Sequence, residues 1–194
     1  MKNINFDNLT AEEIGKLFPI QIVPYNPDWI ALFEEEKASI IEILDENLTL
    51  NIEHIGSTSI AELAAKPTID ILIEISELTN EIKLIITKKL EDIGYRNMYS
   101  SEKEKSMTFG KGYDLDFVDI QTYHAHIREK SKMLQDEIYF RDYLRQNSNA
   151  RDEYTKLKYA LAEKHRFNRE EYTRAKTEFI KKITEKYRKE ILEK

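Results

Sequence analysis

The chain contains no cysteine, and this absence excludes a disulfide framework, a zinc ribbon and a thiol nucleophile. Glycine and proline are scarce, with five and four residues among 194, which argues against an all-β architecture with many tight turns. No stretch approaches the roughly 18 apolar residues of a membrane span. Hydrophobic residues still make up 41% and charged residues 34%, a balance typical of a globular protein rich in solvated helix.

Acidic residues outnumber basic residues by 36 to 30, which gives the chain a formal net charge of −6. Such a chain is poorly suited to generic binding of duplex nucleic acid, although a local basic patch can still hold a phosphate. The first residues, MKNINFDNLTAEEIG, lack the apolar run behind a basic end that a secretory signal requires. We therefore expect a cytoplasmic protein without a membrane partner.

The first part of the sequence has the spacing of a mixed α/β unit. A capping box at 10–13 predicts a short helix, and apolar residues at helical spacing predict a longer one over 27–45. Alternating isoleucines make 68–75 the clearest strand, and a helix over about 79–93 follows it. Shorter elements are expected to be strands at 20–23, 51–55, 95–99, 107–109 and 121–128, and a helix-like segment at 57–65.

From residue 133 onward the sequence predicts helix almost to the end, with breaks near Asn147 and Asn168. The last helix has an apolar stripe that includes Tyr172, Phe179 and Tyr187. We expect residues 1–130 to form the α/β domain and residues 131–194 a helical part packed on it, within one structural domain.

The segment at 53–59, Glu-His-Ile-Gly-Ser-Thr-Ser, joins two predicted strands. Gly56 allows a close backbone approach, and the hydroxyls and free amides of Ser57 and Thr58 at a helix start suit a phosphate. Asp70 lies on the next strand, facing away from its isoleucine neighbours, and a carboxylate there needs a partner or a cation. These residues predict a phosphate or metal site; an ordinary turn beside a structural aspartate is the alternative.

A second polar pattern, Tyr-His-Ala-His-Ile-Arg at 123–128, falls on a predicted strand. Alternation places His124 and His126 on one face, about 7 Å apart. Two imidazoles at this spacing can converge on one cation or phosphate, although two ligands alone do not make a metal site. A polar sheet face with neutral histidines is the alternative.

Several blocks of the sequence, in order from about residue 20 to residue 181, together resemble the GrpB family. They are Val-Pro-Tyr-Asn-Pro-Asp-Trp at 23–29, the segment at 53–59, Leu-Ala-Ala-Lys-Pro at 63–67, Ile-Asp-Ile at 69–71, His-Ala-His at 124–126 and Phe-Arg-Asp-Tyr-Leu at 140–144. The resemblance implies an α+β, nucleotidyltransferase-like fold, in which helices flank a small mixed β-sheet and a C-terminal helical part follows.

The resemblance also implies roles for the polar residues. The general nucleotidyltransferase pattern is Gly-Ser, then a strand with two alternating acids, then a third acid on a neighbouring strand, and these acids hold two divalent cations on the nucleotide phosphates. Gly56, Ser57 and Asp70 match this pattern. Leu72 stands at the second acid position and cannot bind a metal, which puts two-magnesium catalysis in doubt.

The third acid position falls to His124 or His126. The expected catalytic and metal-binding residues are therefore Asp70, His124 and His126, and the expected cofactor is a divalent metal ion (Mg, Mn or Zn). One carboxylate with two imidazoles favours a softer ion, such as zinc, manganese or nickel, over magnesium, which prefers oxygen ligands.

Other family-like positions can line the site. The expected nucleotide- or phosphate-binding residues are Gly56, Ser57, Thr58, Lys66 and Arg141. A solvated lysine and an ordinary ion pair are the alternatives for the last two. Lys158, Tyr172 and Lys176 can reach a cleft between the two halves or lie on a solvated helix face, whereas Tyr25 and Trp29 fit packing better than base stacking.

The main hypothesis is an enzyme that transfers a nucleoside monophosphate or a related phosphoryl group, acting with a divalent metal on a nucleotide or phosphorylated small molecule. The alternative is a non-catalytic module that binds such a molecule, because Leu72 removes one expected metal ligand. A third hypothesis is a helical interaction protein, with residues 133–192 as the partner surface. No unusual basic composition supports duplex nucleic acid as a partner.

Overall fold

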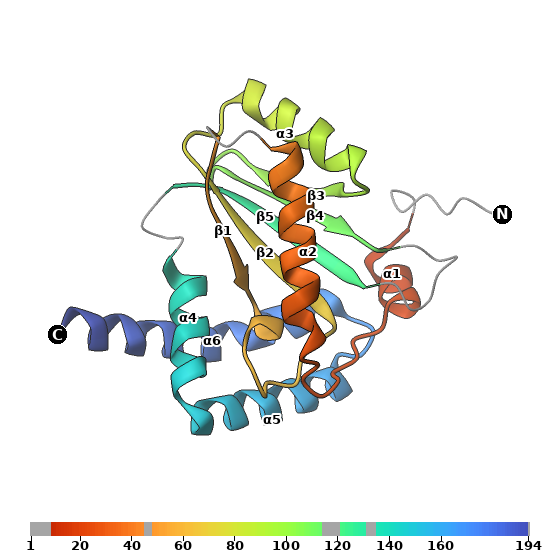
Figure 1. Cartoon of the computed structure of the whole chain (residues 1–194). Helices are drawn as coiled ribbons and strands as arrows, with labels where there is room; N and C mark the ends of the chain where they lie inside the picture. Colours follow the sequence, from red (N-terminus) through yellow and green to blue (C-terminus); the bar gives the residue numbers. More distant parts are fainter. Residues whose placement is uncertain (1–8, 45–47, 114–120, 131–134, 194) are drawn as a thin grey trace.

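The computed structural model describes residues 9–44, 48–113, 121–130 and 135–193. Five strands form one mixed sheet in the order β1-β2-β5-β4-β3. Their bounds are β1 Thr49–Ile55, β2 Thr68–Ile75, β3 Arg96–Ser101, β4 Ser106–Lys111 and β5 Thr122–Glu129. β2 and β5 are parallel, and the other neighbouring strands are antiparallel. The predicted class, a small mixed sheet flanked by helices, is confirmed (Figure 1).

Helices α2 (Asp28–Ile43) and α3 (Asn80–Asp92) cover one face of the sheet (Figure 1). Asn26 accepts a hydrogen bond from the backbone N–H of Asp28 at 3.0 Å, and the apolar spacing of α2 then turns Trp29, Phe33 and Ile40 inward. These side chains form the main core with the isoleucines of β2 and the apolar face of α3. Strand alternation therefore leaves the other face of β2 for polar side chains.

Helices α4 (Gln135–Gln146), α5 (Ser148–Lys164) and α6 (Arg169–Leu192) form the helical part. Asn147 and Asn168 are the N-caps of α5 and α6, where the sequence predicted breaks. A second core joins this part to the segment after β1; it comprises Ile60, Leu63, Phe140, Tyr143, Leu144, Ala150, Tyr154 and Ile183. No helix within the described ranges is both long enough and apolar enough to traverse a bilayer.

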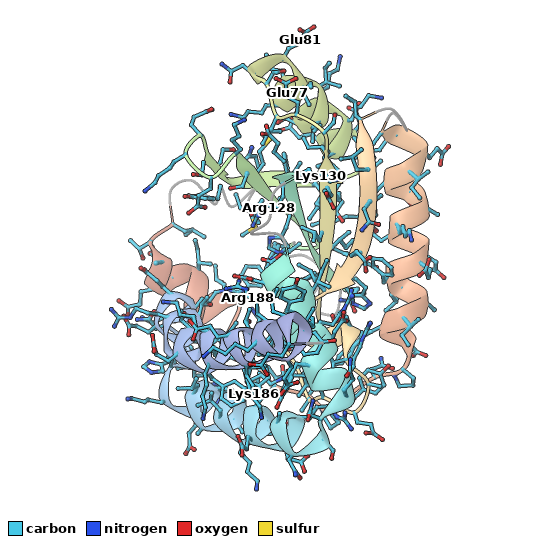
Figure 2. The ribbon with its side chains drawn as sticks, turned by 90° about the vertical axis from the view of Figure 1, so that its left-hand side faces the viewer. Glu77, Glu81, Arg128, Lys130, Lys186 and Arg188 are labelled. Carbon is cyan, nitrogen blue, oxygen red and sulfur yellow. The ribbon has the colours of Figure 1, made fainter. Side chains whose placement is uncertain are left out.

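The helical part covers only one end of the second sheet face. Ile138 of α4 packs on Ile55 and Leu72, which lie on the same face as Asp70. Viewed from the side, α3 lies above and α6 below, with Arg128 and Lys130 between them (Figure 2). The apolar stripe of α6 packs within the molecule, since Tyr172 and Ile183 are buried and Phe179 packs on the second core.

Two predictions of local structure were wrong. Residues 20–23 do not form a strand; Val23 makes a single antiparallel bridge with Ala65, because Pro24 lacks the N–H that would extend the pairing. The expected helix-like segment at 57–65 is a single 3-10 turn, Ser57–Ser59, after which Ile60 and Leu63 enter the second core. The predicted capping box at Thr10 is present and begins α1 (Ala11–Leu17).

Candidate metal and anion site

Asp70, His124 and His126 converge on the sheet face opposite α2. β2 and β5 are adjacent parallel strands, and their register pairs Asp70 with His124. Oδ1 of Asp70 lies 3.3 Å from Nδ1 of His124 and 3.2 Å from Nε2 of His126. Each residue thus offers one ligand atom, and the three atoms lie within 4.8 Å of one another. This donor set and spacing fit a single divalent cation with nitrogen and oxygen ligands.

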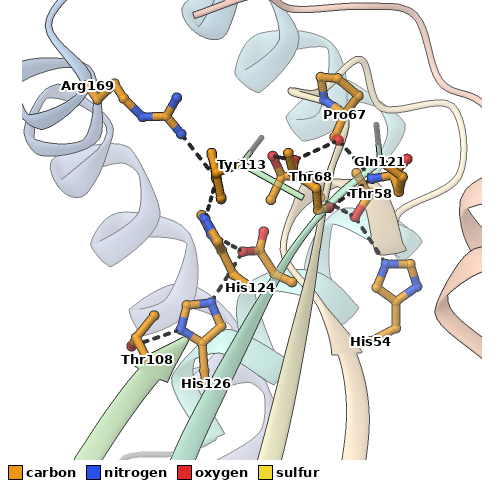
Figure 3. A network of polar contacts seen from close by, with 12 residues as sticks. His54, Thr58, Pro67, Thr68, Thr108, Tyr113, Gln121, His124, His126 and Arg169 are labelled. Atoms are coloured by element: carbon orange, nitrogen blue, oxygen red, sulfur yellow. Dashed lines mark hydrogen bonds and ion pairs between the residues drawn. The ribbon is translucent and has the colours of Figure 1, made fainter. Parts of the chain in front are cut away.

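Each imidazole of the site also contacts a hydroxyl group through its second nitrogen (Figure 3). The hydroxyl of Tyr113 lies 2.6 Å from Nε2 of His124, and Oγ1 of Thr108 lies 3.5 Å from Nδ1 of His126. The guanidinium of Arg169 in turn donates to the hydroxyl of Tyr113 at 3.4 Å. Outer partners of this kind fix the orientation and tautomer of metal-binding histidines.

The charge states of the cluster suit metal binding. Burial by itself raises the pKa of Asp70, but hydrogen bonds and charge from His124 and His126 outweigh it and hold the pKa well below its usual range. Burial lowers the pKa of His124 despite the neighbouring carboxylate. At neutral pH Asp70 is therefore ionised and His124 is neutral, and these are the forms that bind metals.

The Gly-Ser turn lies directly beside Asp70. Gly56 has φ of 69° and ψ of −173°, a conformation that is essentially restricted to glycine. A Cβ atom at this position would lie 2.3 Å from Oδ2 of Asp70, so the turn can approach the carboxylate only without a side chain. The next residue, Ser57, accepts a hydrogen bond from the Nζ atom of Lys158 at 3.3 Å.

Two of the predicted phosphate-binding side chains are engaged elsewhere. Thr58 is 1% exposed, and its hydroxyl donates to the carbonyl of Thr68 at 3.1 Å. Arg141 donates to carboxylate oxygens of Glu53 and Asp142, each at 2.8 Å. The structure therefore brings Gly56, Ser57 and the Asp70–His124–His126 cluster together, whereas Thr58 and Arg141 make other contacts.

Three residues around the cluster have no counterpart in the sequence prediction: Thr108, Tyr113 and Arg169. Thr108 pairs with His126 across β4 and β5, and Tyr113 follows a glycine after the end of β4. Arg169 is the first residue of α6. No local pattern marks them, because each reaches the cluster through pairing or packing of distant segments.

For three residues the sequence left open whether they reach the cleft or lie on a solvated helix face, and the structure shows that they are largely buried. Lys158 and Tyr172 are each 2% exposed, and Lys176 is half-buried. The Nζ atom of Lys176 lies 4.4 Å from the ring centre of Tyr172. As the sequence indicated, Trp29 is a packing residue, with its ring 5.5 Å from that of Tyr25 in an edge-to-face contact.

Comparison with solved structures defines the class of fold. The chain resembles a Cid1 poly(U) polymerase solved with MgGTP bound, with a TM-score of 0.51 and 12% identity over 79% of this chain and 46% of that chain. At this identity the likeness shows the fold alone, which is that of the nucleotidyltransferases.

A much nearer structural match is the crystal structure of the conserved protein GrpB from Enterococcus faecalis, with a TM-score of 0.77 and 34% identity over 89% of this chain and 99% of that chain. The UPF0157 protein BH1888 of Halalkalibacterium halodurans is 32% identical over 91% of this chain and 89% of its own length. The glutamate-rich protein GrpB of Alkalihalophilus pseudofirmus is 31% identical over 84% of this chain and 92% of its own length. The GrpB protein family profile matches residues 19–186, and the chain belongs to this family.

Proposed function

We infer that this chain is a metal-dependent transferase of the nucleotidyltransferase type, which acts on a nucleotide or a phosphorylated small molecule. The observation that supports this inference most strongly is the convergence of Asp70, His124 and His126 beside the Gly56–Ser57 turn. The likeness to a polymerase of the same fold that was solved with MgGTP bound supports a nucleotide as the substrate class.

The residues present fit one divalent ion. Asp70 supplies an ionised oxygen ligand, and His124 and His126 supply nitrogen ligands that Tyr113 and Thr108 orient. This mixed set favours zinc, manganese or nickel over magnesium. When bound, such an ion supplies positive charge to the transferred phosphoryl group and acidifies an attacking hydroxyl group.

The polar groups beside the cluster have binding roles in this proposal. The hydroxyl of Ser57 donates to a phosphate oxygen while it accepts from Lys158, and Lys66 neutralises phosphate charge. In the transfer, the oxygen of an acceptor hydroxyl group bonds to the α-phosphorus of a nucleoside triphosphate, and its proton passes to water. The bond from that phosphorus to the bridging oxygen breaks, and pyrophosphate leaves with the electron pair.

The test is product formation from each nucleoside triphosphate with magnesium, manganese, zinc and nickel in turn. The wild-type chain is compared with Asp70→Asn and with the control Glu74→Gln, which lies farther along the same face of β2. We expect metal-dependent release of pyrophosphate from the wild type and the control, and loss of at least about a hundredfold in Asp70→Asn. The absence of metal-dependent turnover with every nucleotide would refute the proposal.

A binding module without catalysis is the second candidate, and Leu72 favours it. This side chain is 1% exposed and packs on Ile55, so the position of the second expected acid is apolar and closed. Saturable nucleotide binding in calorimetry, without product in any metal, supports the module and contradicts the transferase.

A further inference from the structure

Four basic side chains lie near the Asp70 cluster or near the Gly56–Ser57 turn beside it. Lys66 lies just before β2, Lys158 is on α5, and Arg169 and Lys176 are on α6. Of the described carboxylates, none lies within 4.0 Å of the charged nitrogens of these four residues, whereas other buried or half-buried basic side chains, such as Lys111 and Arg141, have carboxylate partners. A protein with a net charge of −6 thus places several basic side chains without carboxylate partners close to one another.

Lys158 is the most deeply buried of the four, at 2% exposed. Its Nζ atom donates to the carbonyl of Ala64 and, at 3.3 Å, to the hydroxyl of Ser57. The same atom lies 4.6 Å from the ring centre of Tyr154. A buried amine with neutral partners only is costly as a cation, so an anion that binds beside Ser57 gains a strong, prepositioned donor.

Lys176 acts electrostatically on both Lys66 and Lys158, and Arg169 acts on Lys66, so these groups lie near one another. Burial, followed by the charges of Arg169 and Lys176, lowers the pKa of Lys66 to about 7. Burial, followed by the charge of Lys176, lowers the pKa of Lys158 to about 6. Asp70 is the acid that acts in the opposite direction on both Lys66 and Lys176.

We propose that Lys66, Lys158, Lys176 and Arg169 form an oligophosphate site that binds its ligand without a metal ion. This proposal rests on the proposed function in one respect, because the ligand is the di- or triphosphate group of the same substrate. Four basic donors on three separate segments match the charge and the number of acceptor oxygens of two or three linked phosphates better than those of a single phosphate. The closed, apolar position of Leu72 removes a second metal ligand, and the cationic side chains supply the charge that a second ion would supply.

The experiment uses the full chain, inorganic triphosphate and isothermal titration calorimetry in excess EDTA. We expect saturable one-to-one binding, and binding of inorganic monophosphate at least about tenfold weaker. Lys158→Met and Lys176→Met each weaken triphosphate binding by about tenfold or more. The controls are Lys156→Met and Lys182→Met, exposed positions on the same two helices, and they leave the affinity unchanged.

Each outcome decides the proposal. The proposal is overturned if triphosphate binding disappears in EDTA. It is also overturned if Lys158→Met and Lys176→Met both leave the affinity for triphosphate unchanged. Because Lys158→Met alters a buried position, circular dichroism checks its fold, and the half-buried Lys176→Met gives an independent measurement. Asp70→Asn separates this proposal from the transferase: we expect it to lose turnover and to retain triphosphate binding. Wild-type binding of triphosphate without any turnover refutes the transferase alone.

Discussion

The carboxylate of Asp70 lies against the backbone of Gly56, so closely that a Cβ on the glycine would be 2.3 Å from Oδ2. This contact joins the Gly-Ser turn to the Asp70–His124–His126 cluster. It also connects the two proposed subsites, because Ser57 accepts its hydrogen bond from Lys158 directly after the glycine. The position of the turn is therefore part of the chemistry of the site.

Gly56→Ala is expected to destabilise the protein by about 3 kcal/mol or more, from backbone strain and from the clash with Asp70. The same change is expected to weaken zinc or manganese binding, because the carboxylate must move. Urea denaturation and metal titration by calorimetry measure the two effects.

Gly94→Ala is the matched control for this prediction. Gly94 follows α3 and also has positive φ, 91°, but no atom lies within 4 Å of the point that a Cβ would occupy there. We expect a cost of about 1–2 kcal/mol from strain alone and unchanged metal binding. Equal losses in the two variants would show that the contact with Asp70 has no special effect.

Tyr113→Phe removes the hydroxyl that lies 2.6 Å from Nε2 of His124. Loss of such an outer partner typically lowers metal affinity by about 10- to 100-fold, and we expect a reduction in this range. Tyr159→Phe, an exposed tyrosine on α5, is the control. Metal titration of both variants checks the prediction, and an unchanged affinity in Tyr113→Phe contradicts it.

The stability of the protein is expected to fall between about pH 6.5 and pH 4. Burial lowers the pKa of His54 to about 4, and its ring stacks on Phe33 with centroids 4.6 Å apart. The unfolded chain takes up a proton at about pH 6.5, so in this range it binds more protons than the folded chain. Stability therefore falls by up to about 1.4 kcal/mol for each unit by which the pH is lowered. The lowered pKa of His124 acts in the same direction.

His54→Gln isolates the contribution of this one histidine. Denaturation midpoints measured at several pH values should depend on pH less steeply in the variant than in the wild type. The same dependence in both proteins would assign the acid sensitivity to other groups.

An ion pair between a buried carboxylate and a half-buried lysine links α2 to β4. The Nζ atom of Lys111 lies 2.8 Å and 2.9 Å from the two carboxylate oxygens of Glu36, which is buried. Lys111→Met leaves the carboxylate without its partner, and we expect a loss of about 3–5 kcal/mol. The double variant Glu36→Leu/Lys111→Met should recover most of that loss, and urea denaturation of the four proteins of the cycle measures it.

Local sequence patterns were sufficient for most elements and for the faces of the key strands. The alternating isoleucines predicted β2 together with the position of Asp70 on its other face, and β5 was predicted in the same way. The capping residues Thr10 and Asn168 marked where helices begin. These features depend on backbone periodicity and on hydrogen bonds between residues a few positions apart, which are local properties.

The sequence by itself therefore determined the class of fold, the main elements and the residue types of the candidate site. The tertiary structure alone decided that β2 lies parallel to β5 with Asp70 opposite His124, and that Glu36 meets Lys111. It also decided that Lys158 is buried beside Ser57 and does not lie on a solvated helix face. Such contacts depend on the packing of segments far apart in the chain. A local sequence pattern does not determine how favourable that packing is.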